Sequence, residues 1–178
     1  MSGRPAVFLD RDGTLMHEVG YCANPRDVAV YPGVREALER LREAGFALIV
    51  ITNQSGIGLG YFTEAEYHAV QAELARQLAP VQIDGVYFSP DTPDSGSPRR
   101  KPAPGMIYEA ARDHGIDLAR SYFVGDREGD MQCGARAGLR TVLVETGYGA
   151  QFPDCSADYR ARDFRQAVEW ILEDARRE

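Results

Sequence analysis

Short apolar runs recur along the chain and predict buried strands. Each run is four to six residues long, which is the usual length of a strand covered on both faces. Polar or glycine-containing segments bound them. The predicted strands cover residues 6–9, 47–52, 85–89, 121–126 and 141–146.

Helical patterns occupy the segments between these runs. In residues 34–45, Val34, Leu38 and Leu41 fall on one face, and Gly45 is a typical helix stop. Thr63 is followed three residues later by Glu66, which is the signature of a capping box. The predicted helices cover about 34–45, 63–78, 105–114, 130–137 and 164–176.

The alternation of strands and helices predicts an α/β fold with a mostly parallel sheet covered on both faces. The 178 residues suffice for one domain with a substantial core, so we expect a single domain over residues 1–178. Ligands of such folds bind beyond the carboxyl ends of the strands. The polar residues that follow each predicted strand are therefore the candidates for chemistry.

Composition and charge restrict the possible functions. Lys and Arg total 20 and Asp and Glu 27, so the net charge is 20 − 27 = −7, which argues against nonspecific nucleic-acid binding. No apolar stretch approaches the roughly 20 residues of a membrane span, and the first ten residues do not resemble a signal peptide. The three cysteines lie far apart and lack zinc-ligand spacing, which favours reduced thiols in the cytoplasm.

Two carboxylates, Asp10 and Asp12, follow the first predicted strand in the segment DRDGTL. A hard cation such as Mg²⁺ offsets their repulsion, and one carboxylate can then attack an electrophile while the other transfers a proton. The alternative is an ordinary turn formed by Asp12 and Gly13. We favour catalysis because the pair directly follows an apolar strand.

Two further strand ends carry polar groups. Thr52 and the residues after it can hold phosphate oxygens, although a plain glycine-containing loop is the alternative. Asp126 can complete a metal site. Asp130 can lie behind that site, ligate the metal directly, or cap the helix that follows.

The segment SPDTPDSGSPRRKP, residues 89–102, ends in three adjacent cations. Carboxylates and a phosphoryl group together need a fixed cation, and Lys101, next to Pro102 and a predicted helix, is the candidate. The alternative for Arg99, Arg100 and Lys101 is a solvated charge run, and we retain that interpretation for Arg99.

The motifs DRDGT, TNQSG, KP and GD-x-x-x-D occur in this order and together resemble the haloacid dehalogenase-like (HAD) phosphotransferase superfamily. More narrowly, residues 5–150 are similar to the group of D-glycero-D-manno-heptose 1,7-bisphosphate phosphatases and histidinol-phosphate phosphatase domains. The resemblance implies a Rossmann-like three-layer sandwich with a minimal cap.

The resemblance also implies the residue roles. Asp10 would form an aspartyl phosphate and Asp12 would act as the general acid and base. Asp10, the main-chain carbonyl of Asp12, and Asp126 would hold Mg²⁺, while Thr52 and Lys101 would bind phosphoryl oxygens. The residues expected to contact the substrate are Glu18, Val19, Gly20, Tyr21, Asn53, Gln54, Ser55, Arg100 and Arg127.

The chain departs from the group at two places. Residues 89–102 contain no Cys or His where many members bind a structural zinc, so we expect no zinc. Arg127 replaces a common lysine, which keeps the charge but changes its geometry. Arg11 is typical of the group, and we assign it no role from the sequence.

We therefore expect a Mg²⁺-dependent phosphomonoesterase that acts on a small phosphorylated metabolite. A heptose bisphosphate is the leading candidate substrate, and histidinol phosphate is the second. The alternatives are a phosphatase of nucleic-acid ends and a catalytically silent binding protein with the same fold. The expected partner is a small phosphorylated metabolite, with no nucleic acid and no membrane, and the expected state is a monomer.

Overall fold

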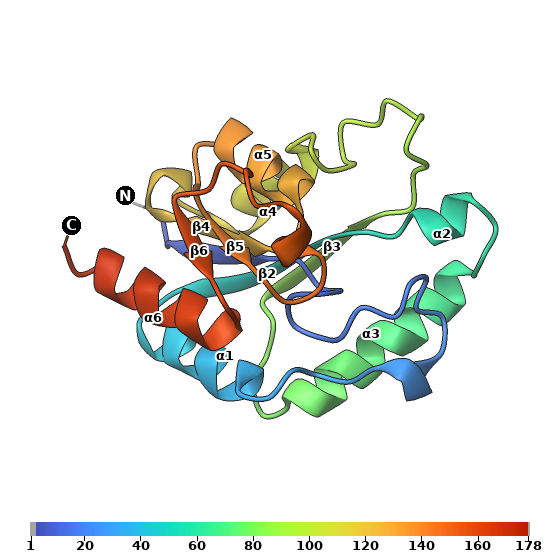
Figure 1. Ribbon diagram of the computed structural model, residues 1–178, viewed down its shortest axis with the longest axis horizontal. Coiled ribbons are helices and arrows are strands. Elements are labelled where there is room, and N and C mark those ends of the chain that lie inside the picture. Colours follow the sequence, from blue (N-terminus) through green and yellow to red (C-terminus); the bar gives the residue numbers. More distant parts are fainter. Residues whose placement is uncertain (1–2, 178) are drawn as a thin grey trace.

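Six strands form one sheet in the computed structural model, which describes residues 3–177 (Figure 1). The order is β3-β2-β1-β4-β5-β6, and each pair of neighbours is parallel. The predicted fold class and the five predicted strands are confirmed. The strands are β1 (Ala6–Leu9), β2 (Ala47–Asn53), β3 (Gly85–Ser89), β4 (Tyr122–Gly125), β5 (Arg140–Val144) and β6 (Tyr159–Ala161).

Helices cover both faces of this sheet (Figure 1). In β1, Val7 and Leu9 enter one core and Ala6 and Phe8 the other, as the two-residue period of a strand requires. The first core is closed by α1 (Val34–Glu43), α3 (Glu64–Leu78) and α6 (Phe164–Asp174); the second is closed by α4 (Gly105–His114) and α5 (Glu128–Arg136).

Element boundaries differ from the predictions at a few places. The capping box at Thr63 and Glu66 is present. Helix α5 begins at Glu128, two residues before the predicted start, because the Asp130 carboxylate accepts a hydrogen bond from the Arg127 main chain and closes the first turn. Strand β6 was not predicted, since three residues are too few for a hydrophobic period.

The strand order reverses direction between β1 and β4, which is where ligands bind in open parallel sheets. The segments above this edge are residues 10–33, residues 54–63 with the short helix α2 (Ser55–Gly58), and the loop of residues 90–104. Within the described part of the chain these segments form no separate cap domain. None of the helices described there is both long and apolar enough to cross a bilayer.

Candidate active site

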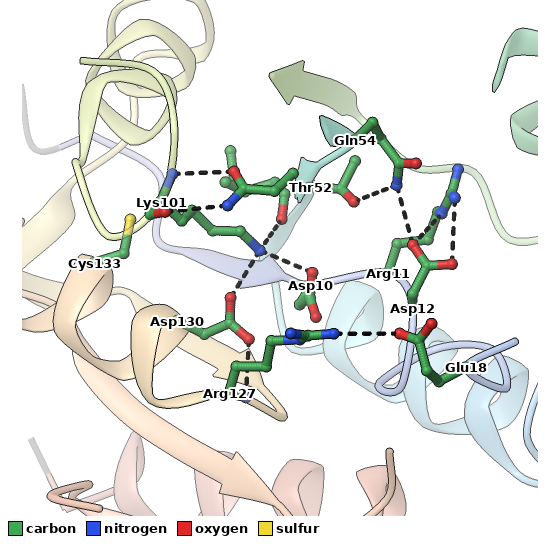
Figure 2. Close-up of polar contacts among 12 residues, drawn as sticks. Asp10, Arg11, Asp12, Glu18, Thr52, Gln54, Lys101, Arg127, Asp130 and Cys133 are labelled. Carbon is green, nitrogen blue, oxygen red and sulfur yellow. Dashed lines mark hydrogen bonds and ion pairs between the residues drawn. The ribbon is translucent and has the colours of Figure 1, made fainter. Parts of the chain in front are cut away.

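A cavity of about 560 Å³ opens at the carboxyl edge of the sheet. It is lined by the last residues of β2, by residues that follow β1, β2, β4 and β5, and by the loop before α4. Figure 2 shows the polar side chains that converge there. The predicted residues that line it are Asp10, Asp12, Glu18, Gly20, Tyr21, Thr52, Asn53, Gln54, Ser55, Arg100, Lys101, Arg127 and Asp130.

Lys101 lies at the centre of the polar contacts and is almost fully buried. Its Nζ atom is 2.8 Å from Asp10 Oδ1 and 2.7 Å from Asp130 Oδ1, and it donates to the Ile51 carbonyl at 2.9 Å (Figure 2). Burial alone would lower the pKa of Lys101, but the two carboxylates outweigh it and raise the pKa. The lysine therefore carries a positive charge.

Asp10 is held in the ionised form. Burial alone would raise the pKa of Asp10. The Lys101 ammonium and several hydrogen bonds outweigh burial, so the pKa of Asp10 lies below its ordinary value. An ionised carboxylate at the end of β1, facing an open cavity, has the character of a nucleophile.

Asp126 is fully buried and has a carboxylate oxygen within 4.8 Å of an Asp10 carboxylate oxygen. Its Oδ2 atom accepts a hydrogen bond from the Tyr148 main chain at 2.9 Å, whereas its Oδ1 atom is buried without a hydrogen-bond partner. Side chains at Gly13 or Gly147 would collide with this carboxylate, and both glycines adopt left-handed φ angles of 84° and 57°.

Asp10, Asp126 and Asp130 each offer an oxygen within 4.8 Å of the others. Burial and the neighbouring carboxylates raise the pKa of Asp126 to about 9 and that of Asp130 to about 6. One ammonium does not balance three carboxylates, and an unpartnered buried oxygen is costly. A set of oxygen donors with excess negative charge fits a hard divalent cation.

Arg11 and Gln54 hold the Asp12 carboxylate (Figure 2). Arg11 donates to Asp12 Oδ2 at 3.0 Å and to Oδ1 at 3.3 Å. Gln54 Nε2 donates to Asp12 Oδ2 at 3.0 Å and to the Thr52 hydroxyl at 2.9 Å. Arg11 is fully buried, and its guanidinium carbon lies 5.5 Å from the Tyr67 ring centre. Arg11, which had no role in the sequence analysis, is therefore the ion-pair partner of the expected acid–base group, Asp12.

Asn53 lines the cavity, and its side-chain amide forms hydrogen bonds with the main chain of Lys101. Its Oδ1 atom accepts from the Lys101 main-chain N–H at 3.0 Å, and its Nδ2 atom donates to the Lys101 carbonyl at 3.1 Å. Both ends of the amide are thus engaged with Lys101. Asn53 positions the lysine, and its substrate contact stays a prediction.

The outer part of the cavity carries two cations, Arg100 and Arg127. The Arg127 guanidinium is 3.8 Å from Glu18 Oε2 and lies 4.2 Å from the ring centre of Tyr148. Tyr148 also lines the cavity and was not predicted, although it closely follows a predicted strand end and the strand-end rule applies to it. Val19 is exposed at the rim and does not line the cavity.

The loop of residues 90–104 makes polar contacts with neighbouring elements and within itself. Arg99 donates to Glu109 Oε1 of α4 at 2.8 Å and to the Phe88 carbonyl of β3 at 2.9 Å. Arg100 donates to the Asp91 carbonyl at 3.2 Å. The prediction of Arg99 as a solvated charge is therefore wrong: its ion pair and main-chain contact connect the loop to a helix and a strand.

The sequence of this chain is similar to those of known phosphatases. The HAD-hydrolase-like family matches residues 98–167. The D-glycero-D-manno-heptose-1,7-bisphosphate 7-phosphatase of Thermosynechococcus vestitus is 41% identical over 94% of this chain and 95% of its own length. The D-glycero-beta-D-manno-heptose-1,7-bisphosphate 7-phosphatase of Escherichia coli O6:H1 is 44% identical over 80% of each chain.

A solved structure is also similar. The D,D-heptose 1,7-bisphosphate phosphatase of B. bronchiseptica, crystallised with magnesium and phosphate, superposes with a TM-score of 0.87 at 32% identity. The match covers 96% of this chain and 99% of that one. The similarity therefore extends over the sheet, the helices and the cavity segments together.

Proposed function

This chain belongs to the family of the D-glycero-D-manno-heptose-1,7-bisphosphate 7-phosphatases, which are HAD-type phosphatases, and we propose that it removes the 7-phosphate of that sugar bisphosphate. The reaction would leave the heptose 1-phosphate. The observation that supports it best is the buried contact between the Asp10 carboxylate and the Lys101 ammonium at the base of an open cavity.

The proposed cofactor is Mg²⁺, held by Asp10, Asp126 and the main-chain carbonyl of Asp12, with Asp130 beside it. The unpartnered Oδ1 atom of Asp126 and the all-oxygen donor set support this assignment. When bound, the cation supplies positive charge that offsets the repulsion between the phosphate dianion and the carboxylates.

In the first chemical step, a carboxylate oxygen of Asp10 attacks phosphorus and the bond from phosphorus to the sugar oxygen breaks. Asp12 donates its proton to that departing oxygen, so a neutral alcohol leaves. Lys101 and the Thr52 hydroxyl hold the phosphoryl oxygens. Because Gln54 donates to the Thr52 oxygen, the hydroxyl hydrogen of Thr52 is available to the phosphoryl group.

In the second step, Asp12, now a carboxylate, takes a proton from water. The resulting hydroxide attacks phosphorus, and the bond between phosphorus and Asp10 breaks to release phosphate. The contacts from Arg11 and Gln54 keep the Asp12 carboxylate at one position through both steps. In phosphoryl transfer, positioning of the reacting groups and neutralisation of charge supply most of the rate enhancement.

The second phosphate of the substrate would lie near Arg100 and Arg127, the two outer cations of the cavity. Burial lowers the pKa of Arg100, and the nearby charge of Arg127 lowers it further, so an anion between the two would relieve their repulsion. Glu18 to Tyr21 would border the sugar. We propose a zinc-free loop, since residues 89–102 offer no Cys or His.

All the groups named come from one chain, so we also propose that the enzyme acts as a monomer. The three cysteines are free in the structure, in keeping with the proposed cytoplasmic location. Histidinol phosphate is the second candidate substrate.

A substrate panel tests the function. With Mg²⁺, the protein should release phosphate from both anomers of heptose 1,7-bisphosphate with a higher kcat/KM than from histidinol phosphate or fructose 1,6-bisphosphate. Asp10→Asn should abolish turnover, because the amide is not a nucleophile. A preference for histidinol phosphate would make it the substrate in place of the heptose bisphosphate. Full activity of Asp10→Asn would refute the mechanism.

A further inference from the structure

Exposed apolar side chains gather beside the cavity. Among residues 3–177, six large apolar residues are exposed, and four of these come from two short segments, 19–21 and 59–61. The four are Val19, Tyr21, Leu59 and Tyr61. A concentration of exposed apolar groups at one place on a protein marks a binding surface more often than chance.

Tyr21 and Tyr61 form the centre of this surface. Tyr21 lines the cavity, and Tyr61 packs against it edge-on, with ring centres 4.6 Å apart and an interplanar angle of 67°. Tyr61 itself does not line the cavity and is 61% exposed. Its ring therefore contacts Tyr21 from the outer side.

The backbone fixes both rings. The Gly56 carbonyl accepts a hydrogen bond from the Tyr61 main chain at 2.8 Å, which folds residues 59–61 back onto α2. Any side chain at Gly56 would collide with Phe62 and approach Tyr21 Cδ1 to 2.9 Å. On the other segment, Glu18 Oε1 accepts from the Gly20 main chain at 2.8 Å and holds the turn before Tyr21.

The cavity thus has two unlike walls. Arg100 and Arg127 supply positive charge, and Tyr21 supplies an aromatic surface. A ligand that matches both walls carries anionic groups on a body with a nonpolar face. A sugar ring has such a face, made of C–H groups, while an open-chain polyol offers no fixed one.

We propose that Tyr61 is a positioning residue that holds Tyr21 as a platform for the C–H face of the sugar ring. The inference rests on the proposed function for the identity of the sugar. Leu59 and Val19 add exposed apolar surface in the same two segments. Selection for a ring would then come from loop residues rather than from a cap domain.

The test compares Tyr61→Ala, Tyr61→Phe and the wild type on three phosphate esters. Heptose 1,7-bisphosphate addresses the function, while glucose 6-phosphate and its open-chain analogue glucitol 6-phosphate form a ring-and-chain pair. Tyr61→Ala should raise KM for the heptose bisphosphate roughly 3- to 10-fold, the range expected for a lost aromatic contact, with kcat unchanged within about twofold. It should also abolish the wild-type preference for glucose 6-phosphate over glucitol 6-phosphate, and Tyr61→Phe should restore both properties.

Tyr108→Ala is the matched control, because Tyr108 is a half-exposed tyrosine on α4 that does not line the cavity. The inference is overturned if Tyr61→Ala behaves like the wild type, if it affects ring and chain substrates equally, or if the wild type has no ring preference. A wild-type dimer that Tyr61→Ala dissociates would assign the surface to a second copy instead. If heptose bisphosphate is not hydrolysed while the ring preference persists, the proposed function fails and the inference stands.

Discussion

At the scale of single residues, Arg11 is a buried guanidinium whose charge is balanced by a reacting group. Burial lowers the pKa of an arginine, but the adjacent Asp12 carboxylate outweighs burial and raises it. The guanidinium spans both Asp12 oxygens, while Gln54 holds one of them from the other side. Arg11 thus fixes the orientation of the proposed acid–base group.

Arg11→Lys tests this role, because an ammonium keeps the charge but lacks the two-pronged geometry. We expect kcat for the heptose bisphosphate to fall roughly 10- to 100-fold, the range for a lost charged hydrogen bond, with a much smaller change in KM. Steady-state kinetics measure the split. Arg35→Lys on the exposed side of α1 is the control, and an Arg11→Lys enzyme within twofold of wild-type kcat contradicts the role.

The buried carboxylates predict how the metal-free protein responds to pH. In the fold, the pKa of Asp126 is raised to about 9 and that of Asp130 to about 6, from an ordinary value of 3.8. Between pH 4 and pH 9 the folded state therefore binds more protons than the unfolded chain. These two groups accordingly destabilise the metal-free protein progressively as pH rises through that window.

Mg²⁺ replaces those protons, so its stabilising effect should grow as pH rises. At a Mg²⁺ concentration 100 times its Kd at pH 8, Tm at pH 8 should be roughly 5–10 °C higher than for protein in EDTA. The same Mg²⁺ concentration should raise Tm by less at pH 5. Thermal unfolding at both pH values measures the difference. Asp126→Asn should lose most of the shift, whereas an equal Mg²⁺ shift at pH 5 and pH 8 would count against the assigned site.

At the scale of elements, the loop of residues 90–104 depends on Arg99. The main-chain and ion-pair contacts of Arg99 connect the loop to β3 and α4, and the next two residues are Arg100 and Lys101. Loss of this connection would remove the Arg99 contacts to β3 and α4, while Asn53 would still bind the main chain of Lys101. The two cations would then be less well placed in the cavity.

Arg99→Ala should therefore lower kcat/KM roughly 5- to 50-fold, since small misplacements of binding groups are costly in catalysis. It should also speed proteolytic cleavage between Thr92 and Ser97. Activity and limited proteolysis measure the two effects. The control is Arg112→Ala, since Arg112 is an exposed arginine of α4 whose described ion pair is with the adjacent Asp113. This variant should change neither activity nor cleavage. Unchanged cleavage and activity in Arg99→Ala would show that the loop is held by other contacts.

Elements whose signals are local in the sequence were the predictable ones. The apolar runs of β1 and β2 and the capping box of α3 are complete within a few residues, so the sequence predicts them well. Strand β6 and the side-chain partners of Arg99 depend on residues that fold close only in the tertiary structure. Patterns along the chain carry little information about such contacts.

At the scale of the whole molecule, the strand order explains why a sparse set of motifs was informative. Parallel strands β1, β2 and β4 end at one edge, which brings Asp10, Thr52 and Asp126 together from distant parts of the sequence. Strand-end polarity therefore predicted the carboxylates. It did not predict that Asn53 would hold the main chain of Lys101, because an amide has many available partners.

The single sheet, with helices packed on both faces, also predicts one cooperative unfolding transition. Trp170, the only tryptophan in the sequence, stacks on Tyr159 of the edge strand β6, with ring centres 5.1 Å apart. Its fluorescence reports the β6–α6 edge, whereas far-UV circular dichroism reports all helices and strands. In urea with EDTA present, both signals should give the same midpoint and a slope of roughly 1–3 kcal/mol/M. A fluorescence midpoint at lower urea than the circular dichroism midpoint would mean that this edge unfolds separately and that residues 1–178 do not behave as one domain. Equal midpoints are expected if β5 and α6 connect the edge to both cores.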